Sequence, residues 1–214
     1  HAIHDPSETH ILTELAERVR AELGRDRHIH LVLENEANNA RYLVPGRLYD
    51  AQWNDDFHHL AHVLATGERN GYYQDYSVDP IGLAGRALAE GFVYQGEASP
   101  FRGGTARGEP SGHLPPSSFV DFLQNHDQIG NRAFGERIAA LADSDSLELL
   151  IALHALSPHI PMLFMGEEWG SRQPFYYFCS FHDELAEAVR TGRRNEFSSF
   201  PEFRDPQSRE RIPD

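Results

Sequence analysis

The chain has 214 residues, of which 40% are hydrophobic and 24% charged, the composition of an ordinary soluble globular protein. A formal net charge of −14 argues against nucleic acid as a partner, because its phosphates need a basic surface. The single cysteine, Cys179, cannot form an internal disulfide, and no apolar run approaches the roughly twenty residues of a membrane span, so we expect no membrane partner.

The first predicted elements are a helix and a strand. Asp5 and the proline after it are typical of a helix start, apolar residues then recur at helical spacing as far as Leu23, and Gly24 can end the helix. Residues 29–33, IHLVL, form the short apolar run expected of a buried parallel strand. That run ends abruptly at Glu34.

The middle of the chain predicts a weak strand, two helices and a long loop. The strand is expected over 49–53 and the helices over 57–66 and 80–90. Asp55 or Asp56 can cap the first helix, and Asp79 the second. Residues 95–118 are rich in Gly, Pro and Ser and are expected to form an irregular loop.

Strands and helices continue to alternate after that loop. We expect strands over 119–123 and 161–165, and helices over 133–141, from an Asp145 cap to Leu156, and over 183–190. Such alternation indicates an α/β fold with a parallel sheet. Polar residues collect where each predicted strand ends, which is typical of a (β/α)₈ barrel, although a doubly wound open sheet follows the same rule.

Two of these strand ends carry groups that could perform chemistry. Glu34 ends one apolar run, and Asp127 follows another beside His126. A carboxylic acid that donates a proton and a second, charged carboxylate are what glycoside hydrolysis requires. Glu36 is the alternative acid, and any single strand-end carboxylate can instead serve as a helix cap.

A metal site is another use for histidine. The only histidine cluster in the sequence is His58, His59 and His62, and two of these lie one helical turn apart. No HExxH pattern is present, and surface histidines on a helix are the simpler interpretation.

Many aromatic residues fall in loops or at strand ends, which favours a carbohydrate groove.

Five segments together resemble the α-amylase family of glycoside hydrolases. FLQNHDQIGNRAFGERI over 122–138 is similar to its seventh-strand motif, and HLVLENEANNA over 30–40 to the fifth-strand segment that bears the proton donor. Segments 49–68, 161–170 and 185–197 are also similar to segments of the family, and all five occur in the same order along the chain. The QIGNR continuation resembles most closely the members that release trehalose from maltooligosyltrehalose, an α-glucan.

The resemblance implies roles for particular residues. Glu34 matches the general acid, Asp127 the aspartate that stabilises the transition state, and His126 a histidine that hydrogen-bonds the sugar. The full set implied to bind substrate is His1, Trp53, Asn54, Asp55, His58, Asn125, His126, Gln128, Asn131 and Arg132. The implied mechanism is retaining and requires no metal or organic cofactor.

The family's nucleophile is an aspartate in a segment similar to RxDAVHAI, and this chain opens with HAIHD. The nucleophile would therefore lie three residues before His1. The resemblance thus implies a fragment: the C-terminal half of the (β/α)₈ barrel, about strands five to eight, over 1–190, followed by a connection over 191–214 toward a C-terminal β domain. We expect such a fragment to be inactive alone and its parent to be cytoplasmic.

Two alternatives remain open. A glycogen-branching enzyme or an ordinary α-amylase would share the barrel and the acid but not the QIGNR continuation. A non-catalytic carbohydrate-binding remnant would share the aromatic residues without needing Glu34 and Asp127 together.

Overall fold

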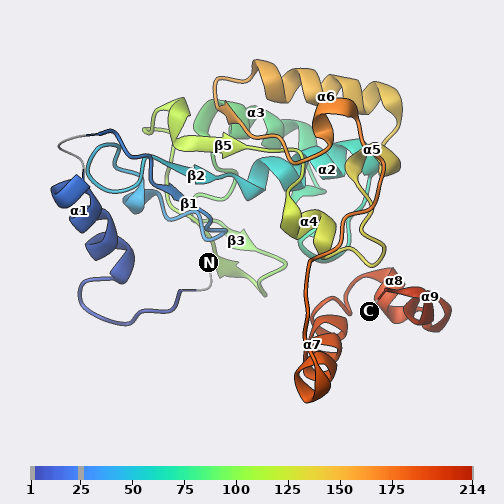
Figure 1. The fold of residues 1–214 in the computed structure, drawn as a ribbon. Coiled ribbons are helices and arrows are strands. Elements are labelled where there is room, and N and C mark those ends of the chain that lie inside the picture. The colour runs from blue at the N-terminus through green and yellow to red at the C-terminus, as the bar shows by residue number, and fades with distance from the viewer. Residues whose placement is uncertain (1–2, 24–26, 214) are drawn as a thin grey trace.

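The computed structural model describes residues 3–23 and 27–213. In these residues the central element is a parallel sheet of four strands in the order β1-β2-β5-β6 (Figure 1). The strands are β1 (Val32–Leu33), β2 (Ala51–Trp53), β5 (Phe119–Asp121) and β6 (Ile160–Pro161). The predicted α/β fold with a parallel sheet is confirmed, but every strand is shorter than expected. Strands β1 and β6 lie at the two edges of this sheet, where hydrogen bonding to a neighbouring strand is available on one side only.

Four helices of eleven to thirteen residues accompany the sheet. They are α1 (Ile11–Leu23), α2 (Asp55–Thr66), α3 (Pro80–Glu90) and α6 (Ser144–Leu156). Helix α2 is the central one, because its apolar residues pack on two sides. Phe57 contributes to a cluster with Leu123 and Leu150, and Leu60 to a second cluster with Ala87 of α3.

Two of the predicted helix starts are corrected. Helix α1 begins six residues after Asp5, whose carboxylate instead accepts bonds from the backbone nitrogens of Ser7 (3.0 Å) and Ile11 (2.5 Å) and so fixes the preceding turn. Helix α6 is capped by Asp143 rather than Asp145, because the Asp143 side chain accepts the bonds of the first turn. The expected helix end at Gly24 lies outside the described residues.

Of the remaining predicted caps, those of α2 are corrected and that of α3 is confirmed. Asp55 and Asp56 lie within the first turn of α2, and the residue before them, Asn54, makes no side-chain cap bond. Asp79 caps α3 as predicted, accepting a bond from the Gly82 nitrogen at 3.0 Å. Gly91 ends α3 at φ +86°, and a Cβ there would meet the Phe119 ring at 2.1 Å, so only glycine fits.

The expected irregular loop contains a hairpin, β3 (Ala98–Ser99) with β4 (Thr105–Ala106). Short 3₁₀ helices occur at Ala40–Tyr42, Gly71–Tyr76, Pro116–Ser118 and Glu167–Trp169. The helix predicted over 133–141 is reduced to α5 (Ile138–Leu141), and an unpredicted helix α4 (His126–Gly130) precedes it.

The C-terminal region is helical, with α7 (Asp183–Glu196), α8 (Pro201–Arg204) and α9 (Pro206–Arg211). Figure 1 shows these helices below the body of the molecule, at the end of a long extended segment. Helix α7 continues past residue 190, so the expected domain boundary falls inside a helix. The division into two domains stays a prediction.

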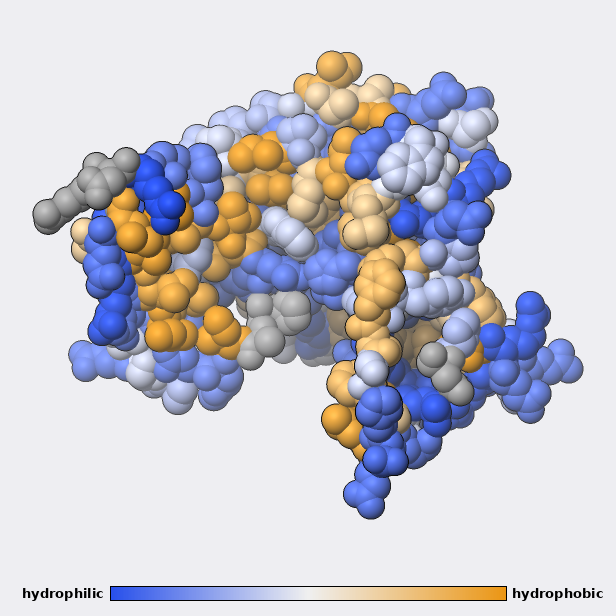
Figure 2. Space-filling view, viewed as in Figure 1, coloured by the Kyte–Doolittle hydropathy of each residue, from blue (hydrophilic) through white to orange (hydrophobic). Residues whose placement is uncertain are grey.

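Apolar side chains remain exposed on α1, where Ile11, Leu15 and Leu23 are each more than 40% accessible. Figure 2 shows orange patches over this end of the molecule. None of the helices that the structure describes is both long and apolar enough to cross a membrane.

Candidate active site

The carboxyl ends of β1 and β5 bring the two predicted catalytic carboxylates together. Glu34 directly follows β1, and Asp127 lies in the first turn of α4, shortly after β5. His126 lies between them, with its Nε2 atom 3.8 Å from Glu34 Oε1 and 3.5 Å from Asp127 Oδ1. All three side chains are partly exposed, so a ligand can reach them.

Helix α4 aims Asp127 through a capping box. The side-chain oxygen of Asn125 accepts a bond from the Asp127 nitrogen at 2.8 Å, and Gln128 Oε1 accepts one from the Asn125 nitrogen at 3.2 Å. Asn125 and Gln128 are buried. Part of the polar segment over 123–132 is therefore a helix cap, and this cap holds the Asp127 carboxylate near the carboxyl end of β5.

A cavity of about 310 Å³ opens beside these residues. Its carboxylates are those of Glu34, Glu36, Asp55, Asp75, Asp127 and Glu196. Its aromatic residues include Tyr72, Tyr76, Phe101, Phe197 and Phe200, and its arginines are Arg102 and Arg107. Polar groups that can bond sugar hydroxyls thus stand next to aromatic faces on which a sugar ring can stack.

Asp55 has the most perturbed carboxyl group on the wall of this cavity. Burial raises the pKa of Asp55 to about 7, and the nearby carboxylates of Asp56, Glu36 and Asp127 act in the same direction against the opposing charge of Arg107. Gln128 Nε2 donates to Asp55 Oδ1 at 3.3 Å. Asp55 therefore connects the capping box of α4 to the cavity wall. With a pKa of about 7, its carboxyl group is partly protonated at neutral pH.

A buried arginine fixes the loop that follows Glu34. Arg107 Nε donates to the backbone oxygen of Glu36 at 2.8 Å, and Arg107 Nη2 pairs with Asp56 Oδ1 at 2.8 Å. The other oxygen of Asp56, Oδ2, accepts bonds from the backbone nitrogens of Val93 and Tyr94 at 2.8 and 3.0 Å. The Glu36 carboxylate itself pairs with Arg102 at 3.0 Å.

Tyr177 is the main site residue that sequence reasoning missed. Its hydroxyl donates to Asp127 Oδ1 at 2.8 Å, and the guanidinium of Arg193 on α7 lies 5.0 Å from its ring centre. Arg193 also bonds the side chain of Asn131, which lines the cavity. Tyr177 stands in a run of aromatic residues, and nothing in that local pattern indicates a partner fifty residues away.

Two residues expected to bind substrate lie in the interior instead. Asn54 is fully buried and donates to the Gly91 oxygen (3.1 Å) and to Asp121 Oδ1 (2.9 Å). His58 is 1% exposed, and its two ring nitrogens bond the Leu123 oxygen (2.6 Å) and the Tyr73 hydroxyl (3.2 Å). Burial lowers the pKa of His58 to about 3, so it is a neutral core residue.

The expectation of surface histidines on α2 is accordingly wrong, because His58, His59 and His62 are all buried.

Arg132, another residue expected to bind substrate, pairs with Glu68 instead: its two terminal nitrogens each bond Glu68 at 2.9 Å, and it does not line the cavity beside Glu34.

Of the other expected residues, Trp53 is half-buried with its ring centre 6.0 Å from that of His126, and His1 lies outside the described residues. Glu34, His126 and Asp127 each offer one ligand atom within 4.8 Å of the others, a spacing that could also hold a cation.

The described fold is similar to that of a solved structure described as an α-amylase-type glycoside hydrolase. A 1.4 Å crystal structure of a candidate α-amylase from Salmonella typhimurium superimposes with a TM-score of 0.86 and 49% identity, covering 92% of this chain and 34% of that one. No protein-family profile matches the chain.

Curated relatives of the chain carry a more specific enzyme name. The malto-oligosyltrehalose trehalohydrolase of Saccharolobus solfataricus is 44% identical over 213 residues, which cover 97% of this chain and 36% of the relative. The enzyme of the same name from Rhizobium sp. strain M-11 is 39% identical over 225 residues, or 97% of this chain and 37% of the relative. The chain is thus homologous over nearly its whole length to malto-oligosyltrehalose trehalohydrolases, and it spans little more than a third of them.

Proposed function

We propose that this chain is part of a retaining glycoside hydrolase that releases trehalose from maltooligosyltrehalose. The observation that carries the proposal is the meeting of Glu34 and Asp127 on either side of His126, at the carboxyl ends of two parallel strands. The names of the homologous enzymes supply the substrate class. We further propose that the sheet is half of a (β/α)₈ barrel and that the protein acts in the cytoplasm.

Each group of the site has a role in this chemistry. An aspartate nucleophile attacks the anomeric carbon while Glu34 transfers its proton to the glycosidic oxygen, so that trehalose leaves as the neutral alcohol. Water then hydrolyses the glycosyl-enzyme with Glu34 as the base, which restores its proton. Asp127 stabilises the positive charge that develops on the sugar, and His126 bonds a hydroxyl of that sugar.

The nucleophile has to stand about 5–5.5 Å from Glu34 in a retaining enzyme. The resemblance assigns that role to an aspartate that precedes residue 1, and the chain spans 36% of the first relative. We therefore propose that the 214-residue chain alone does not hydrolyse maltooligosyltrehalose. Trehalose release by the purified chain, detected chromatographically, would contradict this.

The test of the acid uses the longer protein that contains this chain. Glu34→Gln is expected to lower kcat on maltooligosyltrehalose by about 10²–10⁴-fold, the usual contribution of a general acid. Glu36→Gln is the matched control, since it makes the same change two residues away on a carboxylate paired with Arg102. Loss of turnover in the control with retention in Glu34→Gln would assign the acid to Glu36.

A second candidate function is hydrolysis of plain α-1,4-glucans, favoured by the description of the Salmonella structure as a candidate α-amylase. Maltooligosaccharides of the same length, without the terminal trehalose, distinguish the two. A higher kcat/KM on the plain glucan than on maltooligosyltrehalose would favour this second function.

A further inference from the structure

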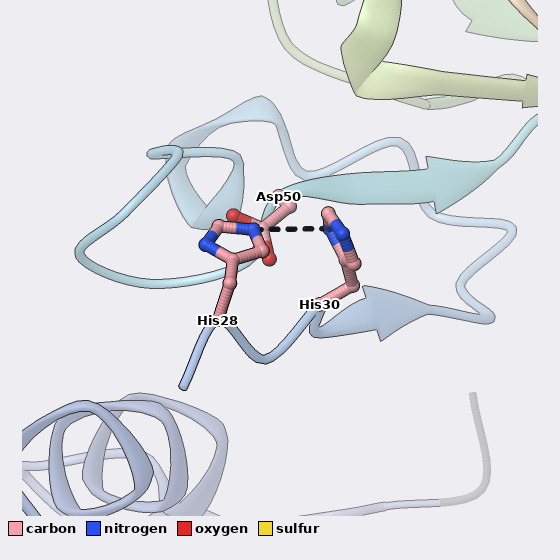
Figure 3. Close-up of side chains that lie close together, drawn as sticks. All are labelled: His28, His30 and Asp50. Atoms are coloured by element: carbon pink, nitrogen blue, oxygen red, sulfur yellow. Dashed lines mark hydrogen bonds between the residues drawn. The ribbon is translucent and has the colours of Figure 1, made fainter. Parts of the chain in front are cut away.

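A second group of metal-binding side chains lies away from the candidate active site. His28 and His30 precede β1, and Asp50 immediately precedes β2, so all three stand at the amino ends of these strands (Figure 3). Each offers one ligand atom, and these atoms lie within 4.8 Å of one another. Glu34, in contrast, follows β1 at the opposite end of the sheet, so the proposed hydrolysis makes no use of this cluster.

The strand register places Asp50 beside the histidines. Val32 pairs with Ala51, so Asp50 lies across from Leu31, with its backbone nitrogen bonded to the Leu31 oxygen at 2.8 Å. His28 and His30 are two residues apart as the chain approaches β1, and side chains at that spacing face the same side of an extended chain. The parallel pairing itself therefore assembles the group.

The two histidine nitrogens already have the spacing of metal ligands. His28 Nε2 and His30 Nδ1 are 3.3 Å apart and share a hydrogen bond, which a bound ion would replace (Figure 3). Two nitrogens bound to one tetrahedral Zn²⁺ at about 2.0–2.1 Å stand roughly 3.3 Å from each other. Both rings are exposed, so an ion can enter without any movement of the core.

The carboxylate of Asp50 is held in a fixed orientation. Its Oδ2 accepts bonds from Arg20 Nη2 (2.7 Å) and the Leu31 nitrogen (2.8 Å), and its Oδ1 accepts a longer bond from the Gly46 nitrogen (3.3 Å). Such outer partners orient a ligand toward a metal. The Arg20 charge opposes a cation nearby, so the site should bind more weakly than a thiolate-rich structural zinc site.

We propose that His28, His30 and Asp50 form a Zn²⁺ site, with water in the fourth position. Imidazole nitrogen and carboxylate oxygen are ligands that Zn²⁺ accepts. The ion would tie the segment before β1 to the start of β2, its partner strand.

The test is calorimetric titration of the untagged, chelator-treated chain with Zn²⁺ at pH 7.5. One equivalent should bind, and His28→Ala or His30→Ala should weaken that binding by about tenfold or more. His113→Ala is the matched control, because His113 is an exposed histidine in another part of the chain. His126→Ala removes the other candidate cluster, at Glu34 and Asp127, and should leave the measured equivalent in place.

The thermal midpoint provides an independent readout. Zn²⁺ should raise the midpoint of the wild-type chain and of His113→Ala, but not that of His28→Ala or His30→Ala, because an ion that binds only the folded state stabilises it. Zn²⁺ binding that survives in both histidine variants, or that disappears in His126→Ala, would overturn the proposal. So would the absence of any binding to the wild-type chain.

Discussion

The hydroxyl of Tyr177 donates a hydrogen bond to Oδ1 of Asp127, across 2.8 Å and fifty residues of sequence. Because Tyr177 belongs to the extended segment that leads to α7, the orientation of Asp127 depends on how the C-terminal helices sit against α4. Arg193 strengthens this connection, since it lies over the Tyr177 ring and bonds Asn131, the residue that follows α4. The C-terminal helices are thereby coupled to the candidate active site.

Tyr177→Phe removes this hydrogen bond and retains the ring. In the longer protein we expect kcat/KM on maltooligosyltrehalose to fall by about ten- to a hundredfold, because a hydrogen bond to a charged group contributes about 1.5–3 kcal/mol. Tyr176→Phe is the control, because it makes the same change on the neighbouring residue, whose hydroxyl donates to the Phe134 backbone oxygen at 3.0 Å. Equal activities of the two variants would show that Tyr177 does not position Asp127.

The buried pair of Asp56 and Arg107 should be important for folding. The two side chains are 0% and 5% exposed, and removing one partner leaves a buried charge without compensation. We expect Arg107→Met to lower the free energy of unfolding by about 3–5 kcal/mol, measured by urea denaturation. The same substitution at Arg41, whose pair with Glu109 is 62% exposed on the arginine side, should cost less than about 1 kcal/mol. Similar losses in both variants would refute the distinction.

Asp55 should make stability depend on pH. Its pKa is about 7 in the folded state against an ordinary value of 3.8, so between these values the folded chain holds a proton that the unfolded chain has released. The free energy of unfolding should therefore fall as the pH rises from about 4 to 7. Asp55→Asn abolishes this contribution, and its thermal midpoint relative to wild type should be higher at pH 8 than at pH 4.5.

Other titrating groups are present in both proteins, so they largely cancel in that comparison. Glu167 is one of them, since burial raises its pKa to about 7 as well. A difference between Asp55→Asn and wild type that is the same at both pH values would show that Asp55 titrates normally.

Arg132 should affect stability rather than substrate affinity. Its paired bonds to Glu68 use the planar guanidinium, which lysine cannot reproduce. Arg132→Lys is expected to reduce the free energy of unfolding by about 1.5–3 kcal/mol and to leave KM for maltooligosyltrehalose unchanged in the longer protein. A raised KM with unaltered stability would return Arg132 to the substrate-binding set.

Sequence reasoning was most successful where a strand ends. Glu34 and Asp127 were predicted to share an edge because parallel strands direct their carboxyl ends the same way, and the structure places them on either side of His126. Helix α3 was predicted with both of its ends, since Asp79 and Gly91 are strong local signals.

The errors arose where a distant partner decides the role of a residue. Asn54 was expected to bind substrate, but its side chain bonds Asp121, which lies 67 residues later. His58 likewise bonds Leu123 from the interior of α2, and helical spacing alone cannot show which face of a helix is covered. Helix α4 was missed although its capping pattern, Asn125 followed three residues later by Gln128, is visible in the sequence.

The capping box of α4 has a practical consequence for anyone who wishes to alter the sugar preference of this loop by directed evolution. Asn125 and Gln128 support the helix and at the same time set the direction of Asp127. Substitutions at these two positions in a random library across 125–132 would therefore alter the helix cap and the direction of Asp127 together. Asn131, the residue after the last turn, lines the cavity outside this capping box, but its side chain bonds Arg193 and Tyr177, so replacing it would also loosen the contact with the C-terminal helices.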